Sequence, residues 1–210
     1  MPTLSSRLLV VTDRHQTNGR PLVPLLQRVL TVTVPMVQLR ERDLSARELA
    51  MLAREVWAMT ASYRSPLLIN DRIDIALALE GVGVHLRNNS LSVSVARQLL
   101  GAQRLLGISV HSVEEVMEAA SQGADYIVLG PIYETPSKKI FGPPLGIHTL
   151  EKACRLVHIP IIGIGGVTAA RALEMRRAGA FGVAVITAIL GAADVESATR
   201  ELLAAVTLEP

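Results

Sequence analysis

The sequence predicts a closed (β/α)8 barrel that takes up residues 1–210 as a single domain. Two observations lead to this prediction. Eight short aliphatic runs recur along the chain, and helical patterns lie between most of them. The runs are continuous rather than alternating, which is typical of parallel strands covered on both faces. A doubly wound open sheet is the rival architecture, but eight near-equal units favour the barrel, which is compact but allowed at 210 residues.

The predicted strands share a high content of β-branched residues, and each gives way to polar residues or glycine. In chain order they cover residues 7–13, 36–41, 66–71, 83–86, 105–110, 126–131, 159–166 and 182–188. No linker or low-complexity stretch interrupts the series, so the chain is expected to fold as one unit.

Capping signals and apolar stripes predict the helices. Residues 45–59 begin with a capping box, Ser45 with Glu48, and residues 111–123 contain a second box, Ser112 with Glu115. Further helices are predicted at 149–157, 168–179 and about 194–206, with weaker patterns at 72–80 and 90–100.

Composition excludes several classes of protein. The net charge is +2 and no block of like charges is present, so we expect no nucleic-acid partner. Cys154 is the only cysteine, which excludes an intrachain disulfide and is typical of a cytoplasmic protein. The first apolar run has four residues before Thr12, too few for a signal peptide. No stretch approaches the roughly 20 apolar residues of a membrane span, so no membrane partner is expected.

Polar side chains follow six of the predicted strands, at the end of a barrel where catalytic groups gather. Gln38, Arg40 and Arg42 occupy alternate positions, so all three are expected to face one way. The stretch "GPIYETPSKK" after the sixth strand is either a plain surface loop or a loop that closes over an anion. The remaining candidates are Asp13, Arg14, Asn70, Asp71, the run Arg87 to Ser90, Ser109, His111, Thr135, Ser137, Lys138 and Lys139.

The last two strands predict a phosphate site. Gly165 and Gly166 end the "GIGG" run and precede a helix start, where free backbone N–H groups can bind an anion. Ile186 and Thr187 end the eighth strand. Loops after the seventh and eighth strands are the usual phosphate site of such barrels.

Several motifs together resemble the thiamine-phosphate synthase family and its TenI-type thiazole tautomerase branch. They are "VQLRER", "LLINDRIDIALA", "GVHL", "GISVHSVEE", "GADYIVLGPIYETPSKK", "GPPLG", "IPIIGIGGV" and "GVAVITAI". Their order and spacing match over nearly the whole chain.

The resemblance implies that a synthase of this family joins a pyrimidine diphosphate to a thiazole phosphate with Mg²⁺. Asp71 matches a magnesium ligand, and Arg42 stands where the synthase has lysine. Gly166, Ile186 and Thr187 match the thiazole phosphate site. The pyrimidine and diphosphate positions are matched by Gln38, Arg40, Asn70, Ser109, Thr135, Ser137 and Lys138.

One segment departs from the synthase pattern. After "GVHL" that pattern reads Gly, Gln, any residue, Asp, whereas this chain has Arg87 and, in place of the second magnesium carboxylate, Ser90. Magnesium usually requires one or two carboxylates besides phosphate oxygens, so the site is expected to be weakened. TenI-type tautomerases lack the same Asp and share the "R-E-R" and "E-T-x-x-K-K" features.

We therefore expect a TenI-type tautomerase that aromatises a carboxythiazole phosphate and needs no cofactor. Arg40 and Lys138 would face the carboxylate. The acid/base is open, because Pro131 stands where the branch has its catalytic histidine; His111 and His85 are the candidates. The alternatives are a Mg²⁺-dependent thiamine-phosphate synthase and a non-catalytic thiazole-phosphate binder or regulator. Whether the protein forms a homo-oligomer is left open.

Overall fold

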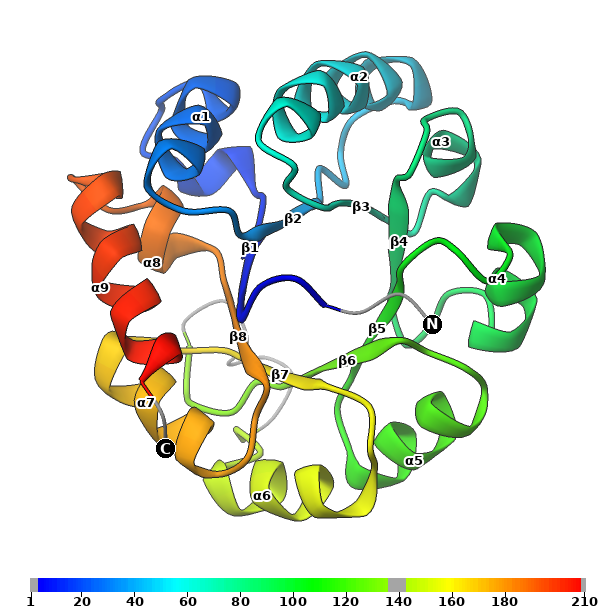
Figure 1. Ribbon diagram of the computed structural model, residues 1–210, viewed down its shortest axis with the longest axis vertical. Coiled ribbons are helices and arrows are strands. Elements are labelled where there is room, and N and C mark those ends of the chain that lie inside the picture. The colour runs from blue at the N-terminus through cyan, green and yellow to red at the C-terminus, as the bar shows by residue number, and fades with distance from the viewer. Residues whose placement is uncertain (1–3, 136–142, 209–210) are drawn as a thin grey trace.

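The structure, a computed structural model, describes residues 4–135 and 143–208. Eight parallel strands form a closed barrel in which each strand pairs with the next and β8 pairs with β1. Helices surround the strands on the outside (Figure 1). The predicted TIM barrel is therefore confirmed. In the described part of the chain, no helix has the length and apolar character needed to cross a bilayer.

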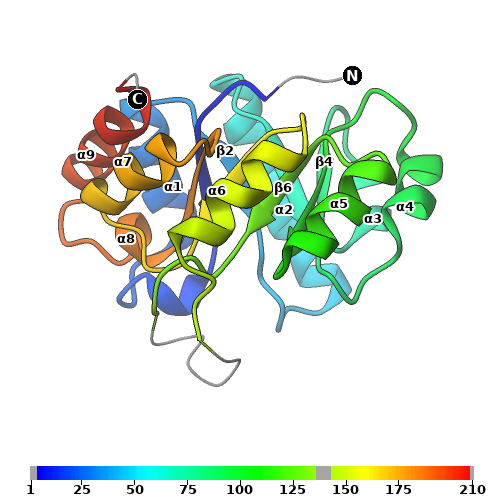
Figure 2. The ribbon, with the colours of Figure 1, turned by 90° about the horizontal axis from the view of Figure 1, so that it is seen from below.

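All eight predicted strands are present, and most are shorter than predicted. Their bounds are β1 Leu8–Val11, β2 Met36–Leu39, β3 Leu67–Asn70, β4 Gly83–Leu86, β5 Leu106–Val110, β6 Tyr126–Leu129, β7 Ile161–Ile164 and β8 Gly182–Val185. The residues lost from the predicted strands are mostly polar or glycine residues at the C-terminal ends. These residues leave the sheet and form the loops that follow each strand, which we call the rim. The loops after β1, β2 and β6 lie at one end of the barrel (lower edge of Figure 2).

The helices follow the predicted order, with two additions. Their bounds are α1 Leu22–Val32, α2 Ala46–Ser62, α3 Ile73–Leu77, α4 Val93–Leu100, α5 Val113–Ser121, α6 Ile147–Leu156, α7 Ala169–Arg177, α8 Thr187–Leu190 and α9 Val195–Thr207, with a short 3-10 helix η1 at Arg14–Gln16. Ser45 and Glu48 form the full predicted capping box. Ser112 caps α5, but the carboxylate of Glu115 accepts instead from the backbone N–H of His111.

The sequence patterns did not predict α1 or α8. Helix α1 contains Pro24 and several β-branched residues, which lower helix propensity. Pro24 lies in the first turn, where its missing N–H costs nothing, and the buried leucines of this helix pack on the barrel. The predicted end of the eighth strand was wrong: Ile186 has φ −118° and ψ −84°, outside the strand region, and Thr187 begins α8.

The inside of the barrel is packed rather than hollow. Its apolar part is formed by Leu9, Val11, Met36, Leu68, Tyr126, Val128, Ile162 and Ala184. Near the C-terminal ends of the strands this filling becomes polar, with Gln38, Asn70 and His85 all buried. These polar groups lie below the rim, so they form the floor of any site above the barrel.

Candidate active site

A cavity of about 430 Å³ opens on the rim, where the loops after β1, β2 and β4 meet. We call it the arginine pocket; its lining residues are Asp13, His15, Arg40, Glu41, Arg42, Asp43 and Arg87. Arg40 and Arg42 reach it together although β2 ends at Leu39. Three guanidinium groups and three carboxylates line this cavity. Glu41 and Asp43 are paired with Arg14, and Arg87 is paired with Asp71, so Arg40 and Arg42 are the cations best placed for an anionic ligand.

Arg40 is the least solvated of the three pocket arginines. Its guanidinium lies 3.9 Å from the carboxylate of Asp13, too far for a hydrogen bond, and its backbone N–H donates to Thr12 Oγ1 at 2.8 Å. Burial lowers the pKa of Arg40, and the neighbouring Arg42 adds to the effect. An arginine remains charged in a protein, so this cation is partly desolvated and loosely paired. A ligand anion is the group that would best complete its environment.

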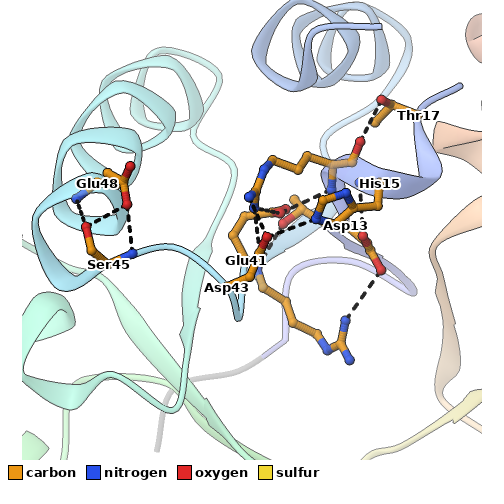
Figure 3. A network of polar contacts seen from close by, with 10 residues as sticks. Asp13, His15, Thr17, Glu41, Asp43, Ser45 and Glu48 are labelled. Atoms are coloured by element: carbon orange, nitrogen blue, oxygen red, sulfur yellow. Dashed lines mark hydrogen bonds and ion pairs between the residues drawn. The ribbon is translucent and has the colours of Figure 1, made fainter. Parts of the chain in front are cut away.

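A polar network fixes the loop that carries these arginines (Figure 3). The carboxylate of Glu41 accepts hydrogen bonds from the backbone N–H of Arg14 at 3.1 Å and from its guanidinium at 3.2 Å. Arg14 also binds both oxygens of Asp43, at 2.7 and 2.5 Å, and lowers the pKa of that carboxyl far below its usual range. The network joins the loops after β1 and β2. Glu41 and Asp43 therefore position Arg40 and Arg42, a role that the sequence patterns did not indicate.

Asp71 does not offer a free carboxylate to a metal. One of its oxygens accepts from the backbone N–H of Arg87 at 3.1 Å, and the other accepts from Nε of Arg87. Ser90 stands in the same loop without a carboxylate. Within residues 4–135 and 143–208, no three His, Cys, Asp or Glu side chains group as a metal site. As arranged, these residues do not fit Mg²⁺, because the guanidinium of Arg87 is bound to the carboxylate of Asp71.

The predicted phosphate residues lie at neighbouring strand ends. Strands β7 and β8 pair with Ile164 opposite Ala184, so Gly165, Gly166, Ile186 and Thr187 follow directly on adjacent strands. Gly165 and Gly166 have φ of +102° and +63°, and the carbonyl of Gly166 accepts from Arg171 at 2.7 Å. Gly166 therefore makes a left-handed turn immediately before α7.

The other predicted residues divide into three groups. Gln38 donates to Asn70 at 3.0 Å in the barrel floor, and Ser109 is hydrogen-bonded to the buried His85 at 2.8 Å. The exposed His111 makes a ring hydrogen bond with the carbonyl of Gly130 at 2.5 Å, so it joins the ends of β5 and β6. Thr135 is the last residue of the first described range. Ser137 and Lys138 lie outside the described residues, so their predicted contacts remain predictions.

The fold and the rim define a TIM barrel with an arginine-lined pocket at the C-terminal ends of its strands. The family model described as thiamine monophosphate synthase matches residues 8–189, and the chain belongs to that family of thiamine biosynthesis. A putative thiamine-phosphate synthase of Geobacter sulfurreducens is 45% identical over 204 residues, 97% of this chain and 96% of its own. The thiamine-phosphate synthase of Moorella thermoacetica is 42% identical and covers 95% of each chain.

Solved structures agree with this family. The thiamine phosphate pyrophosphorylase from Pyrococcus furiosus superposes with a TM-score of 0.86 at 32% identity and covers 95% of each chain. A 3-hexulose-6-phosphate synthase at 18% identity and a TM-score of 0.71 shares the fold alone. The relatives that are named thiamine-phosphate synthase or thiamine phosphate pyrophosphorylase favour the synthase alternative over the tautomerase, which the sequence of the loop after β4 suggested.

Replacing Gly166 by alanine is expected to weaken thiazole-phosphate binding by about tenfold or more. A Cβ at this position would meet the carbonyl oxygen of Glu134 at 2.7 Å and Cβ of Tyr133 at 2.9 Å, and φ is +63°. The turn must therefore move, and the backbone N–H groups move with it. Calorimetric titration with the thiazole phosphate measures the change.

Gly101→Ala provides the matched control for this variant. Gly101 has a similar φ of +70°, but a Cβ there would meet nothing within 4 Å, and the residue lies between α4 and β5, away from the rim. Alanine is strained at both positions because φ is positive, but only Gly166→Ala also brings Cβ against neighbouring atoms. Unchanged thiazole-phosphate affinity in Gly166→Ala would remove Gly166 from the phosphate site.

Proposed function

We propose that this protein is a thiamine-phosphate synthase, which joins a hydroxymethylpyrimidine diphosphate to a thiazole phosphate and releases pyrophosphate. The observation that carries the proposal is the arginine pocket, where Arg40, Arg42 and Arg87 line one cavity of about 430 Å³. A diphosphate has several charged oxygens for these cations, whereas the single carboxylate of a carboxythiazole needs fewer. The names of the relatives at 38–45% identity support the same activity.

The chemistry assigns a task to each part of the rim. The bond between the pyrimidine methylene carbon and the bridging oxygen breaks, and pyrophosphate leaves with the electron pair. The thiazole nitrogen then forms the new bond to that carbon. Negative charge grows on the leaving group, where guanidinium groups fixed in advance stabilise it. The turn at Gly166 and the start of α8 at Thr187 would hold the thiazole phosphate, and thereby orient its ring.

A tautomerase is the second candidate, because of the contacts of Asp71. Its oxygens are engaged by Arg87, and Ser90 supplies no second carboxylate. Proton transfer within a carboxythiazole phosphate needs a phosphate site and a cation for the carboxylate, but no metal. In that reaction Arg40 and Lys138 would face the carboxylate, and the acid/base is still to be assigned.

Parallel assays of the purified protein separate the two reactions. One assay supplies the pyrimidine diphosphate and the thiazole phosphate, and measures thiamine phosphate and pyrophosphate by chromatography. The other supplies the non-aromatic carboxythiazole phosphate, and follows its aromatisation. We expect the first assay to yield thiamine phosphate and pyrophosphate in equal amounts. Aromatisation without thiamine phosphate would replace the synthase by the tautomerase.

The double substitution Arg87→Gly with Ser90→Asp is expected to make turnover depend more steeply on Mg²⁺. It frees the Asp71 oxygen that Nε of Arg87 engages, while the backbone N–H at position 87 still donates to the other oxygen. It also adds the carboxylate that synthases carry at this place, so the site gains the ligand type that magnesium prefers. The measurement is the synthase rate over a magnesium titration, with Ser90→Ala as the control that adds no carboxylate. If the wild-type protein already shows the same magnesium dependence as the double variant, the Arg87 contact does not exclude the metal.

A further inference from the structure

A line of three hydrogen-bonded side chains runs through the barrel floor to the rim. The hydroxyl of Tyr126 on β6 lies 2.8 Å from Nδ1 of His85 on β4, and Nε2 of His85 lies 2.8 Å from Oγ of Ser109 on β5. Gly107 makes room for the line, because a Cβ there would overlap the ring of Tyr126. The three strands are adjacent in the barrel, so closure of the fold sets the geometry.

His85 is neutral in this line. Its exposed fraction is 1%, and burial lowers its pKa to about 3. The nearest charges act in opposite directions, since Asp71 raises the pKa and Arg40 lowers it. A neutral imidazole carries one N–H and one lone pair, so it must donate to one neighbour and accept from the other. The two hydrogen bonds of His85 must therefore run in the same sense along the line, each group donating to the next.

Tyr126 sets that direction. It is fully buried, and burial raises its pKa far above the ordinary value, so the hydroxyl keeps its proton. Among the described residues, its one hydrogen-bond partner is His85. If Nδ1–H donated to Tyr126, the phenolic proton would be buried without an acceptor, which is costly. Tyr126 therefore donates to Nδ1, and the imidazole proton lies on Nε2 and is donated to Ser109.

Ser109 receives that hydrogen bond, so its own proton is left for the site. Its side chain is only partly buried and lies near the C-terminal end of β5. We infer that Tyr126 and His85 are positioning residues that fix Ser109 as a hydrogen-bond donor, and that the ligand atom above it is an acceptor such as an unprotonated ring nitrogen. With the proposed function, on which this part rests, that ring is the pyrimidine. A ring that presents an N–H at this point would be rejected.

The direction of the line can be read by NMR without any turnover. In protein with ¹⁵N-labelled histidine at neutral pH, His85 is expected as the neutral tautomer with the proton on Nε2 and a bare Nδ1. In Tyr126→Phe neither tautomer satisfies both ring nitrogens, so we expect a mixture of the two. A wild-type His85 that is charged, or that carries its proton on Nδ1, would overturn the inference.

Kinetics provide the second readout. Tyr126→Phe is expected to raise KM for the pyrimidine diphosphate by about fivefold to tenfold, while KM for the thiazole phosphate stays the same. Tyr63→Phe is the matched control: it removes the same hydroxyl, but from a tyrosine that follows α2 and leads toward the start of β3, away from the rim. Equal KM values in wild type and Tyr126→Phe would overturn the functional half of the inference. If the wild-type protein makes no thiamine phosphate, the proposed function fails, and the NMR result still decides the direction of the line.

Discussion

Arg40→Ala is expected to lower kcat/KM for the pyrimidine diphosphate by roughly tenfold to 150-fold, because a charge-assisted hydrogen bond is worth about 1.5–3 kcal/mol. The arginine is partly desolvated and its nearest carboxylate is 3.9 Å away, so little in the free protein compensates its charge. Lysine should restore only part of the activity, since it lacks the planar fork that binds two oxygens. Steady-state kinetics on the three proteins measure the effect.

Arg28→Ala is the control for this prediction. Arg28 forms an ion pair with Glu196 between α1 and α9, on the outside of the barrel, and its loss should leave the kinetics unchanged. An Arg40→Ala enzyme within twofold of wild type would show that Arg40 is a solvated surface charge. Lys138→Ala tests the loop after β6, where a contact of Lys138 with the ligand is predicted from the sequence alone.

The second large effect concerns stability at acid pH. Since the pKa of His85 is lowered to about 3 in the folded protein, the unfolded chain binds the extra proton between about pH 6.5 and pH 3. The free energy of unfolding therefore falls as the pH decreases through this window. For this residue alone, the loss between about pH 6.5 and pH 4.5 should be about 2 kcal/mol.

His85→Gln isolates this contribution. Glutamine keeps hydrogen-bonding capacity but does not titrate, so the stability advantage of the wild type over the variant should shrink by about 2 kcal/mol between the two pH values. Denaturant unfolding of both proteins at each pH measures it. The remaining titratable groups are the same in both proteins, so their contributions cancel in the difference. A constant difference would mean that His85 is not buried in its neutral form.

The fold was predictable because its signal repeats along the chain. Eight aliphatic runs with helices between them indicate a barrel even when single boundaries are displaced. Helix α1 was not recognised because Pro24 and its β-branched residues oppose local helix formation, and tertiary burial of the leucine face overrides them. The alternating polar residues extended the predicted strand β2 to Glu41, but pairing stops at Leu39.

The site was predictable residue by residue, but not as a set of contacts. Arg40, Arg42 and Arg87 were visible as cations at strand ends. The binding of Arg87 to Asp71 and the contacts of Arg14 with Glu41 and Asp43 depend on where the loops meet in space. The line from Tyr126 to Ser109 joins three strands that are distant in sequence. No spacing rule along the chain can reveal such contacts.

We expect the rim to hold two anions at once: a diphosphate in the arginine pocket and a thiazole phosphate at the ends of β7 and β8. Calorimetric titration of pyrophosphate into protein saturated with the thiazole phosphate tests it most directly. We expect pyrophosphate to bind once per chain without displacing the thiazole phosphate, and to bind more weakly to Arg40→Ala. Full competition between the two ligands would mean a single anion site, and would contradict the account.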